Sequence, residues 1–197
     1  MPKPFVFDRA YYQRHYRDAR TRVTDAAMTA RLGAFVAAYL GYLEQPVRSV
    51  LDLGCGLGAW RRIARRHFPG ATYTGVEVSA YLCRTYGWTR GSVVDYVAAA
   101  PADLVVCRGV LQYLPAAAAR RAIRHLAANC AGALVLEALT REDWKRNCDR
   151  ERTDGAVFLR PAAWYRRELA RHFVAAGGGV FLARRSSAVL FELEALR

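Results

Sequence analysis

The most informative segment of the sequence is Val50-Leu51-Asp52-Leu53-Gly54-Cys55-Gly56-Leu57-Gly58-Ala59-Trp60, where a short apolar run leads directly into a glycine-rich turn. A continuous apolar run of this length is typical of a strand that is covered on both faces. Because glycine lacks a Cβ atom, Gly54 and Gly56 allow a tight backbone turn and the close approach of a bound ligand. The segment therefore predicts a strand, a ligand-binding turn and the start of a helix.

A carboxylate follows this turn at the spacing expected for a nucleoside site. Glu77 ends the next apolar run, 21 positions after Gly56, where its side chain can accept hydrogen bonds from both ribose hydroxyls. Gly54, Gly56 and Ala59 also fit the pattern G-x-G-x-x-G/A, so NAD is an alternative ligand. Asp52 argues against NAD, because a negative charge at the turn repels a pyrophosphate and suits an ammonium or sulfonium. A simpler role for Asp52 is to cap the amide groups of the turn.

Strand-like and helix-like segments alternate along the chain, which predicts βαβ units and a parallel sheet. The strand candidates are residues 49–53, 72–78, 92–96, 103–107, 133–139, 180–183 and 188–193. The last two, joined by residues 184–187, predict an antiparallel hairpin at the end of the chain. Helices are expected at residues 11–22 and 25–43, after Gly58, from Pro115 to about 128, and from Pro161 to about 176, where residues 177–179 are three glycines.

Three segments together resemble the small-molecule branch of the class I S-adenosylmethionine-dependent methyltransferases. Residues 50–58 resemble the family's first motif, residues 75–79 (GVEVS) its second, and residues 102–114 (ADLVVCRGVLQYL) its fourth strand with the start of the next helix. The resemblance, over roughly residues 47–139, implies a Rossmann-like three-layer α/β/α sandwich. Its seven-stranded, mostly parallel sheet would have the order 3-2-1-4-5-7-6 with strand 7 antiparallel, in agreement with the predicted hairpin.

The same resemblance implies S-adenosyl-L-methionine as cofactor, S-adenosyl-L-homocysteine as product, and a set of contact residues. These are Asp52, Gly54, Cys55 and Gly56 for the methionine part, Glu77 for the ribose, Val78, Ser92 and Asp95 for the adenine, and Cys107, Arg108 and Leu111 for the far side of the pocket. The third strand departs from the family pattern, because its usual Gly-Asp pair is Gly91-Ser92 here. Tyr11 and Tyr16 can lay an aromatic lid over the cofactor, or pack their helix on the sheet.

The acceptor side is predicted from the chemistry of the transfer. Displacement of a methyl group from a sulfonium requires mainly that nucleophile, carbon and sulfur be collinear, and a general base only when the nucleophile arrives protonated. Glu137, near the end of the 133–139 strand, is the catalytic candidate, although a carboxylate at a strand end can also be merely solvated. We expect one domain over residues 1–197, with a helical lid at 1–45 and an ordered substrate cap at 140–160.

Composition limits the acceptor and the compartment. The 197 residues include 30 Lys+Arg and 17 Asp+Glu, a net charge of +13 that suits an acidic small molecule or a nucleic acid. The arginines fall on predicted helix faces in different parts of the chain, so a small-molecule acceptor is favoured over RNA. If that small molecule is acidic, we expect Arg108 and Arg152 to bind it. An RNA methyltransferase and a non-catalytic S-adenosylmethionine-binding protein are the alternatives.

The cysteines and the hydropathy of the chain predict a reducing compartment. The five cysteines form no C-x-x-C pair, so we expect free thiols and no metal site. The sequence has no long apolar run and no apolar signal segment after Met1, which predicts a cytoplasmic protein without a membrane partner. The oligomeric state is left open.

Overall fold

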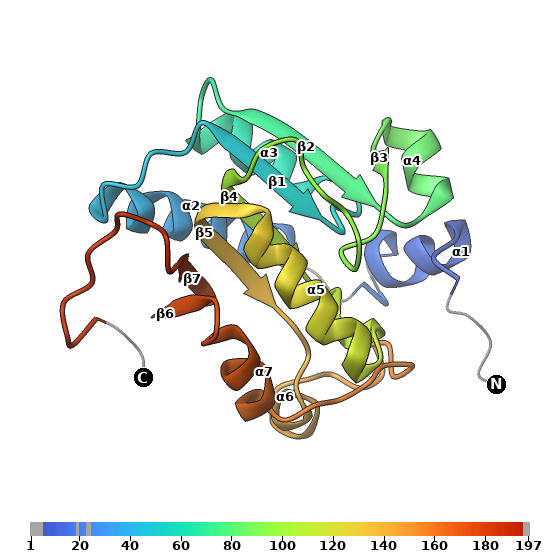
Figure 1. Ribbon diagram of the computed structural model, residues 1–197. Helices are drawn as coiled ribbons and strands as arrows, with labels where there is room; N and C mark the ends of the chain where they lie inside the picture. The colour runs from blue at the N-terminus through green and yellow to red at the C-terminus, as the bar shows by residue number, and fades with distance from the viewer. Residues whose placement is uncertain (1–5, 19, 23–24, 195–197) are drawn as a thin grey trace.

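The computed structural model describes residues 6–18, 20–22 and 25–194, in which a seven-stranded sheet lies between two layers of helices (Figure 1). The strands are β1 Ser49–Leu53, β2 Thr72–Glu77, β3 Thr89–Arg90, β4 Ala102–Arg108, β5 Cys130–Glu137, β6 Phe173–Gly177 and β7 Val180–Ala183. Their order is β3-β2-β1-β4-β5-β7-β6, and β7 runs antiparallel to β5 and β6. The α/β/α fold, the strand order and the antiparallel strand 7 implied by the resemblance are confirmed.

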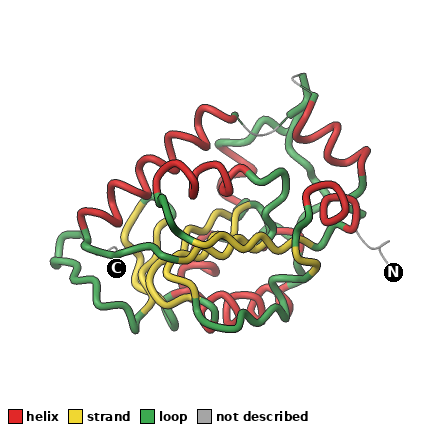
Figure 2. The backbone as a smooth tube through the Cα atoms, turned by 90° about the horizontal axis from the view of Figure 1, so that it is seen from above, coloured by secondary structure: helices red, strands yellow, loops and turns green. Residues whose placement is uncertain are grey.

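Helices cover both faces of the sheet, as Figure 2 shows. They are α1 Arg9–Tyr12, α2 Ala26–Tyr42, α3 Ala59–His67, α4 Ala80–Tyr86, α5 Ala116–Ala128, α6 Arg141–Arg146 and α7 Ala162–Leu169, with a π-helical turn η1 Gln13–Arg17 and a 3-10 turn η2 Leu111–Tyr113. Helices α2 and α3 pack on one face of the central strands, and α5 and α7 pack on the other. Alternate side chains of each strand point to opposite faces, so the central strands are buried under both layers.

The first βα unit forms as its sequence predicts. Strand β1 spans the predicted residues 49–53, and α3 begins after Gly58, which has a φ of +74°. Trp60 and Ile63 of α3 are buried, whereas Arg61 and Arg62 are exposed. Because β1, β2, β4 and β5 are parallel, their carboxyl ends meet at one edge of the sheet, where the glycine turn also lies.

The prediction of a third strand at residues 92–96 is wrong. The strand is the earlier pair Thr89–Arg90, which aligns with the end of β2. Residues 92–96 form a turn in which the Ser92 carbonyl accepts hydrogen bonds from the amides of Asp95 and Tyr96 at 3.2 and 2.8 Å. The Ser92 hydroxyl also accepts from the Val94 amide at 3.3 Å. Serine and aspartate favour such local bonds, so the valines of this segment are buried from a turn and not from a strand.

The terminal hairpin lies one element earlier than predicted. The expected helix from Pro161 ends at Leu169, and Phe173–Gly177 forms β6, which pairs with β7. Gly178 and Gly179, with φ of +58° and +79°, form the loop between these strands. Glycine pairs with positive φ match the twist of a hairpin, so this glycine run is a hairpin loop and not a helix stop. Residues 188–193, the other predicted strand, lie outside the sheet.

The N-terminal segment is less regular than predicted. The expected helix at 11–22 is divided into α1, the π-helical turn η1 and a short turn, whereas the helix expected at 25–43 is α2. Residues 1–5, 19 and 23–24 of the predicted lid and 195–197 of the predicted domain lie outside the described residues. Helices α4 and α6 were not predicted, although Thr140 and Asp143 form a capping box at the start of α6.

The structure also shows the state of the cysteines and the character of the helices. All five cysteines are free thiols within the described part of the chain. None of the helices that the structure describes combines the length and the apolar character needed to span a bilayer.

Candidate functional site

A cavity of about 1430 Å³ lies at the carboxyl edge of the sheet. It is lined by the ends of β1, β2, β4 and β5, the N-terminal turns α1 and η1, and part of the 140–160 connection. Pockets for one drug-sized ligand usually measure about 300–1,000 Å³. The cavity therefore has room for a nucleoside ligand and a second molecule.

Most of the predicted site residues meet in this cavity. Those that line it are Tyr11, Tyr16, Asp52, Gly54, Cys55, Gly56, Glu77, Val78, Ser92, Arg108 and Glu137. Three others do not: Asp95 is exposed on the 92–96 turn, whereas Cys107 and Leu111 are fully buried in the hydrophobic core. The roles assigned to all of these residues stay predictions.

The glycine turn is fixed to β2 and leaves space on its cavity side. The amides of Gly54 and Cys55 donate to the Val76 carbonyl at 2.8 and 3.2 Å. Gly54 has a φ of +87°, and a Cβ atom on it would collide with Val110. Gly56 has a φ of +52°, and apart from its own chain neighbours no atom of the described residues lies within 4 Å of the place its Cβ would occupy. Gly56 is therefore the position at which the absent side chain leaves room for a ligand.

Glu77 is buried, and two backbone amides hold its carboxylate in place. Its Oε2 accepts a hydrogen bond from the Gly56 amide, and its Oε1 accepts one from the Ser79 amide, both at 2.9 Å. A carboxylate oxygen has two lone pairs, so each oxygen can accept one further hydrogen bond. The arrangement suits a pair of adjacent hydroxyl groups.

Asp52 lies in β1 with only 2% of its surface exposed. Its Oδ2 accepts a hydrogen bond from the Tyr73 hydroxyl at 2.7 Å, and no amide of the glycine turn donates to it among the described residues. Burial raises the pKa of Asp52 to about 7, although the Tyr73 hydrogen bond acts in the opposite direction. The structure does not support the capping role, and a cationic group in the cavity would favour the ionised carboxylate.

Trp88 holds the glycine turn through its side chain, and only an indirect signal in the sequence points to it. Its indole N–H donates to the Gly56 carbonyl at 3.0 Å, and the Arg61 guanidinium lies 5.5 Å from its ring centroid. A Cβ atom on Gly75, inside β2, would lie 2.8 Å from the Trp88 ring. A glycine inside a strand often marks such a close approach, which is the available signal.

On the side of the cavity away from Glu77, at the ends of β4 and β5, Glu137 is paired with Arg108. We call this side the acceptor end. The Arg108 Nε donates to Glu137 Oε2 at 3.0 Å, and the Arg108 Nη2 contacts the same oxygen. Both side chains line the cavity. The carboxylate predicted to be catalytic is therefore engaged by a neighbouring guanidinium.

A group of tyrosines also lines the cavity. The hydroxyls of Tyr11 and Tyr113 lie 2.8 Å apart, and the Phe7 ring packs edge-on against both of their rings. Tyr12 and Tyr16 also line the cavity. Burial raises the pKa of all four tyrosines, so their hydroxyls stay protonated at neutral pH. These tyrosine side chains line the cavity, and the predicted role of Tyr11 and Tyr16 as a lid over the cofactor stays a prediction.

The 140–160 connection is fastened to the body of the protein near both of its ends. The Leu139 amide donates to the Gln112 side chain at 3.4 Å, and the Phe158 amide donates to the Gln112 carbonyl at 2.7 Å. The buried Arg160 guanidinium donates to the carbonyls of Leu111 and Leu114 and to the Tyr165 hydroxyl. None of these anchors was identified from the sequence.

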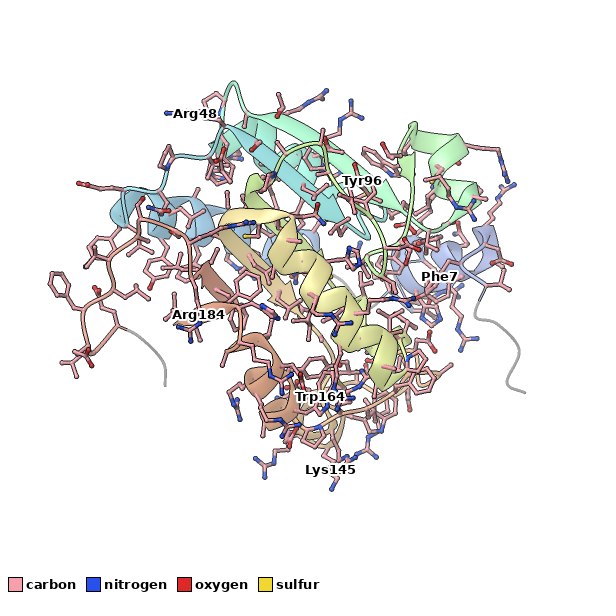
Figure 3. The ribbon with its side chains drawn as sticks, in the orientation of Figure 1. Phe7, Arg48, Tyr96, Lys145, Trp164 and Arg184 are labelled. Carbon is pink, nitrogen blue, oxygen red and sulfur yellow. The ribbon has the colours of Figure 1, made fainter. Side chains whose placement is uncertain are left out.

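Arg160 is also held by an aromatic ring. Its guanidinium lies 5.0 Å from the ring centroid of Trp164, which Figure 3 shows near the lower end of α5. The Arg120 guanidinium of α5 lies 5.5 Å from the same ring. Arg160 therefore joins the connection to α7 and to the turn before α5.

Comparison with known proteins shows one family. A family model described as a methyltransferase domain matches residues 15–182. The trans-aconitate 2-methyltransferase of Azoarcus sp. (strain BH72) is 32% identical over 74 residues, which are 34% of this chain and 29% of that protein. The match thus spans less than a third of the curated relative.

Two solved structures share the fold. One is an amino pentose methyltransferase from Micromonospora echinaspora with S-adenosylmethionine bound, at a TM-score of 0.63 and 20% identity, covering 92% of this chain and 99% of that one. The other is magnesium protoporphyrin IX methyltransferase from Synechocystis PCC 6803 with S-adenosylhomocysteine bound, at 0.58 and 21%, covering 90% and 94%.

Proposed function

Because the chain belongs to the methyltransferase domain family, of the class I S-adenosylmethionine-dependent type, we propose that it transfers the methyl group of S-adenosylmethionine to a small molecule. The family assignment confirms the resemblance of the three sequence motifs. The observation that best supports the activity is the Glu77 carboxylate, held by two amides beside the open position at Gly56. The acceptor atom is an oxygen, a nitrogen or a carbon.

The residues of the cavity fit this cofactor. Glu77 has lone pairs left for two ribose hydroxyls, and Asp52 would face the ammonium of the methionine part. The turn at Gly56 leaves space for the methionine chain, while Val78 and Ser92 would contact the adenine. When bound, S-adenosylmethionine supplies an electrophilic methyl group on a sulfonium that departs as a neutral thioether.

The chain itself contributes binding, alignment and exclusion of water. The glycine turn and Glu77 would fix the nucleoside so that the methyl group faces the tyrosine-lined end of the cavity. We propose that α1 with η1 acts as a lid at this end and that residues 140–160 act as a cap. An acceptor held between them would be aligned for in-line attack with little bulk water around it.

The proposal is tested by titration and by a transfer assay. Calorimetry should detect binding of S-adenosylhomocysteine to the purified chain. Tritiated S-adenosylmethionine should then label a small-molecule fraction of a cell extract and leave its RNA fraction unlabelled. Failure to bind the nucleoside would refute the proposal. Label in RNA alone would favour the RNA methyltransferase, and binding without transfer would favour a non-catalytic binding protein.

Replacing Gly56 with alanine should weaken cofactor binding more than it weakens the fold. A Cβ atom at this position would enter the space reserved for the ligand, so we expect about a tenfold loss of S-adenosylhomocysteine affinity. The φ of +52° adds a backbone cost of roughly 1–2 kcal/mol to folding. Calorimetry and thermal unfolding measure the two effects separately.

Gly41→Ala is the matched control for this substitution. Gly41 lies in α2, has no atom within 4 Å of its Cβ position and does not line the cavity. Alanine there should raise stability by about 0.5–1 kcal/mol and leave affinity unchanged. Equal affinities for the Gly56→Ala variant and the wild type would contradict the assigned position of the ligand.

Cofactor affinity should increase with pH, because Asp52 must be ionised to meet an ammonium. Its folded-state pKa of about 7 lies above its ordinary value, so below that pH the free protein carries a proton that binding must release. We expect S-adenosylhomocysteine affinity to rise about tenfold from about pH 6 to about pH 8 and to level off above the pKa. Calorimetry in two buffers measures the released proton. Asp52→Asn should remove the dependence, and a flat wild-type profile would contradict it.

The distribution of arginines favours a small-molecule acceptor over RNA. The arginines of α3 lie on one side of the sheet and those of α5 and α7 on the other, so they form no single phosphate-binding track. Arg108 and Arg152, expected to meet an acidic acceptor, are paired with Glu137 and Asp149. If the acceptor carries an acidic group, the cavity arginines without an ion pair among the described residues are better placed: Arg22, Arg31, Arg62 and Arg66.

A further inference from the structure

Three segments that are far apart in the sequence bring polar side chains to the acceptor end of the cavity. Tyr11 and Tyr16 come from α1 and η1, Tyr113 comes from η2, and Asp154 comes from the 140–160 connection. Asp154 contributes to the raised pKa of each of these three tyrosines through its charge and, at Tyr113, also through a side-chain hydrogen bond. Asp154 therefore lies beside the tyrosine cluster, in the same cavity and within hydrogen-bond reach of Tyr113.

Asp154 differs from the neighbouring carboxylates because one of its oxygens is uncommitted, that is, it accepts no hydrogen bond among the described residues. Its Oδ1 accepts the Ala156 amide at 2.9 Å, whereas its Oδ2 is buried and has no hydrogen-bond partner among the described residues. By contrast, Glu137 is paired with Arg108, and Asp149 with Arg152. A buried carboxylate oxygen without a partner is costly, which is explained if a ligand completes it.

The cluster also connects the acceptor end to the nucleoside end. Burial raises the pKa of Tyr16, and the charges of both Glu77 and Asp154 raise it further, so both carboxylates act on this hydroxyl. Glu137 acts on the same hydroxyl. A nucleoside on Glu77 and a second ligand on Asp154 would therefore share one cavity, with Tyr16 under the influence of both carboxylates.

We propose that Asp154, and not Glu137, is the carboxylate that binds the acceptor, and that the acceptor is an amine. This inference rests on the proposed methyl transfer. A carboxylate with one buried oxygen, in a cavity that is also lined by tyrosines, favours a cation, because a carboxylate and the faces of aromatic rings both attract an ammonium group. Neutral tyrosine hydroxyls at the same place can accept its remaining N–H groups.

The step balances without a further reactant. The ammonium gives one proton to Asp154 Oδ2, which leaves a lone pair on nitrogen and a protonated carboxyl group. That lone pair forms the bond to the methyl carbon while the carbon–sulfur bond breaks and its electron pair stays on sulfur. The product is a methylated ammonium beside a neutral thioether, and the proton on Asp154 is then lost to solvent.

The test uses a nucleoside that carries an amine at the reacting position. In sinefungin a carbon bearing an ammonium group replaces the methylated sulfonium, so its charge lies where the methyl group lies. We expect Asp154→Asn to reduce sinefungin affinity at least about tenfold and to leave S-adenosylhomocysteine affinity within about twofold, measured by calorimetry. Glu151→Gln is the matched control, because Glu151 is exposed in the same connection and does not line the cavity.

The outcomes separate this inference from the proposed function. Selective loss of sinefungin affinity in Asp154→Asn supports the inference. The inference is overturned if Asp154→Asn loses affinity for both nucleosides equally or for neither, or if Glu137→Gln shows a larger selective loss of sinefungin affinity. In each of these cases, binding of S-adenosylhomocysteine to the wild type leaves the proposed function intact. A second measurement, with tritiated cofactor and panels of primary amines, alcohols and carboxylic acids, should label an amine. Labelling confined to alcohols or acids overturns the assigned acceptor.

Discussion

The Glu77→Ala variant is expected to lose at least about 100-fold in affinity for S-adenosylhomocysteine. Two ribose hydroxyls would each donate a hydrogen bond to a charged oxygen, and such bonds contribute about 1.5–3 kcal/mol each. The substitution also releases the amides of Gly56 and Ser79, which the carboxylate now orients at 2.9 Å. The affinity loss therefore combines missing contacts with a less ordered turn. Isothermal titration calorimetry measures it directly.

Two further variants distinguish binding from folding. Glu77→Gln keeps the shape of the side chain but replaces one acceptor oxygen with an NH₂ group, which opposes an amide donor, so its affinity should fall by a similar factor. Glu151→Ala removes an exposed carboxylate that does not line the cavity and should leave affinity unchanged. If Glu77→Ala bound S-adenosylhomocysteine within about threefold of the wild type, the assignment of the ribose site would be wrong.

The Arg160→Ala variant should have the largest effect on stability, with a fall of roughly 3 kcal/mol in the free energy of unfolding. Its guanidinium donates to the carbonyls of Leu111 and Leu114 and to the Tyr165 hydroxyl, and only 6% of the residue is exposed. Removing the donor leaves buried acceptors unpaired at a cost of about 1–3 kcal/mol each, offset in part because a buried charge is also removed. Denaturant unfolding measures the change.

The effect should also be visible in the 140–160 connection itself. Because Arg160 fastens its end to η2 and α7, the variant should be cleaved faster by protease within this segment. Arg141→Ala is the matched control, since Arg141 is exposed in α6, and its loss should change stability by less than about 0.5 kcal/mol. A loss below about 1 kcal/mol for Arg160→Ala would contradict an anchoring role.

The predicted fold is wrong at places where one local sequence pattern is compatible with two different backbone structures. Three consecutive glycines can end a helix or form a hairpin loop, and only the pairing of β6 with β7 selects the hairpin. Val93 and Val94 are buried as a strand would bury them, but they reach the core from a turn made by Ser92. In both places the hydrophobic pattern was identified correctly and the backbone geometry was not.

The residues of the site also fall into two groups, those that the sequence pattern brings together and those that only the tertiary fold brings together. The residues of the glycine turn and Glu77 come from consecutive βα units, so the sheet topology alone places them at one edge. Asp154, Tyr113 and Tyr11 belong to no shared motif and meet only because the 140–160 connection folds back over η2. No spacing rule relates such residues, so Asp154 and Tyr113 were not identified as site residues from the sequence, whereas Tyr11 was predicted only as part of a lid over the cofactor.

The sequence by itself determined the ligand-binding turn and the acid that follows it, and its resemblance to a family implied the order of the sheet. These features depend on short-range patterns: an apolar run, glycines at fixed spacing, and a carboxylate at the end of the next strand. Only the tertiary structure decided which carboxylate at the acceptor end forms an ion pair and which keeps an oxygen without a hydrogen bond among the described residues. Glu137 meets Arg108 because β4 and β5 align those residues, whereas Asp154 Oδ2 is buried without a hydrogen-bond partner among the described residues. Such pairing depends on long-range packing.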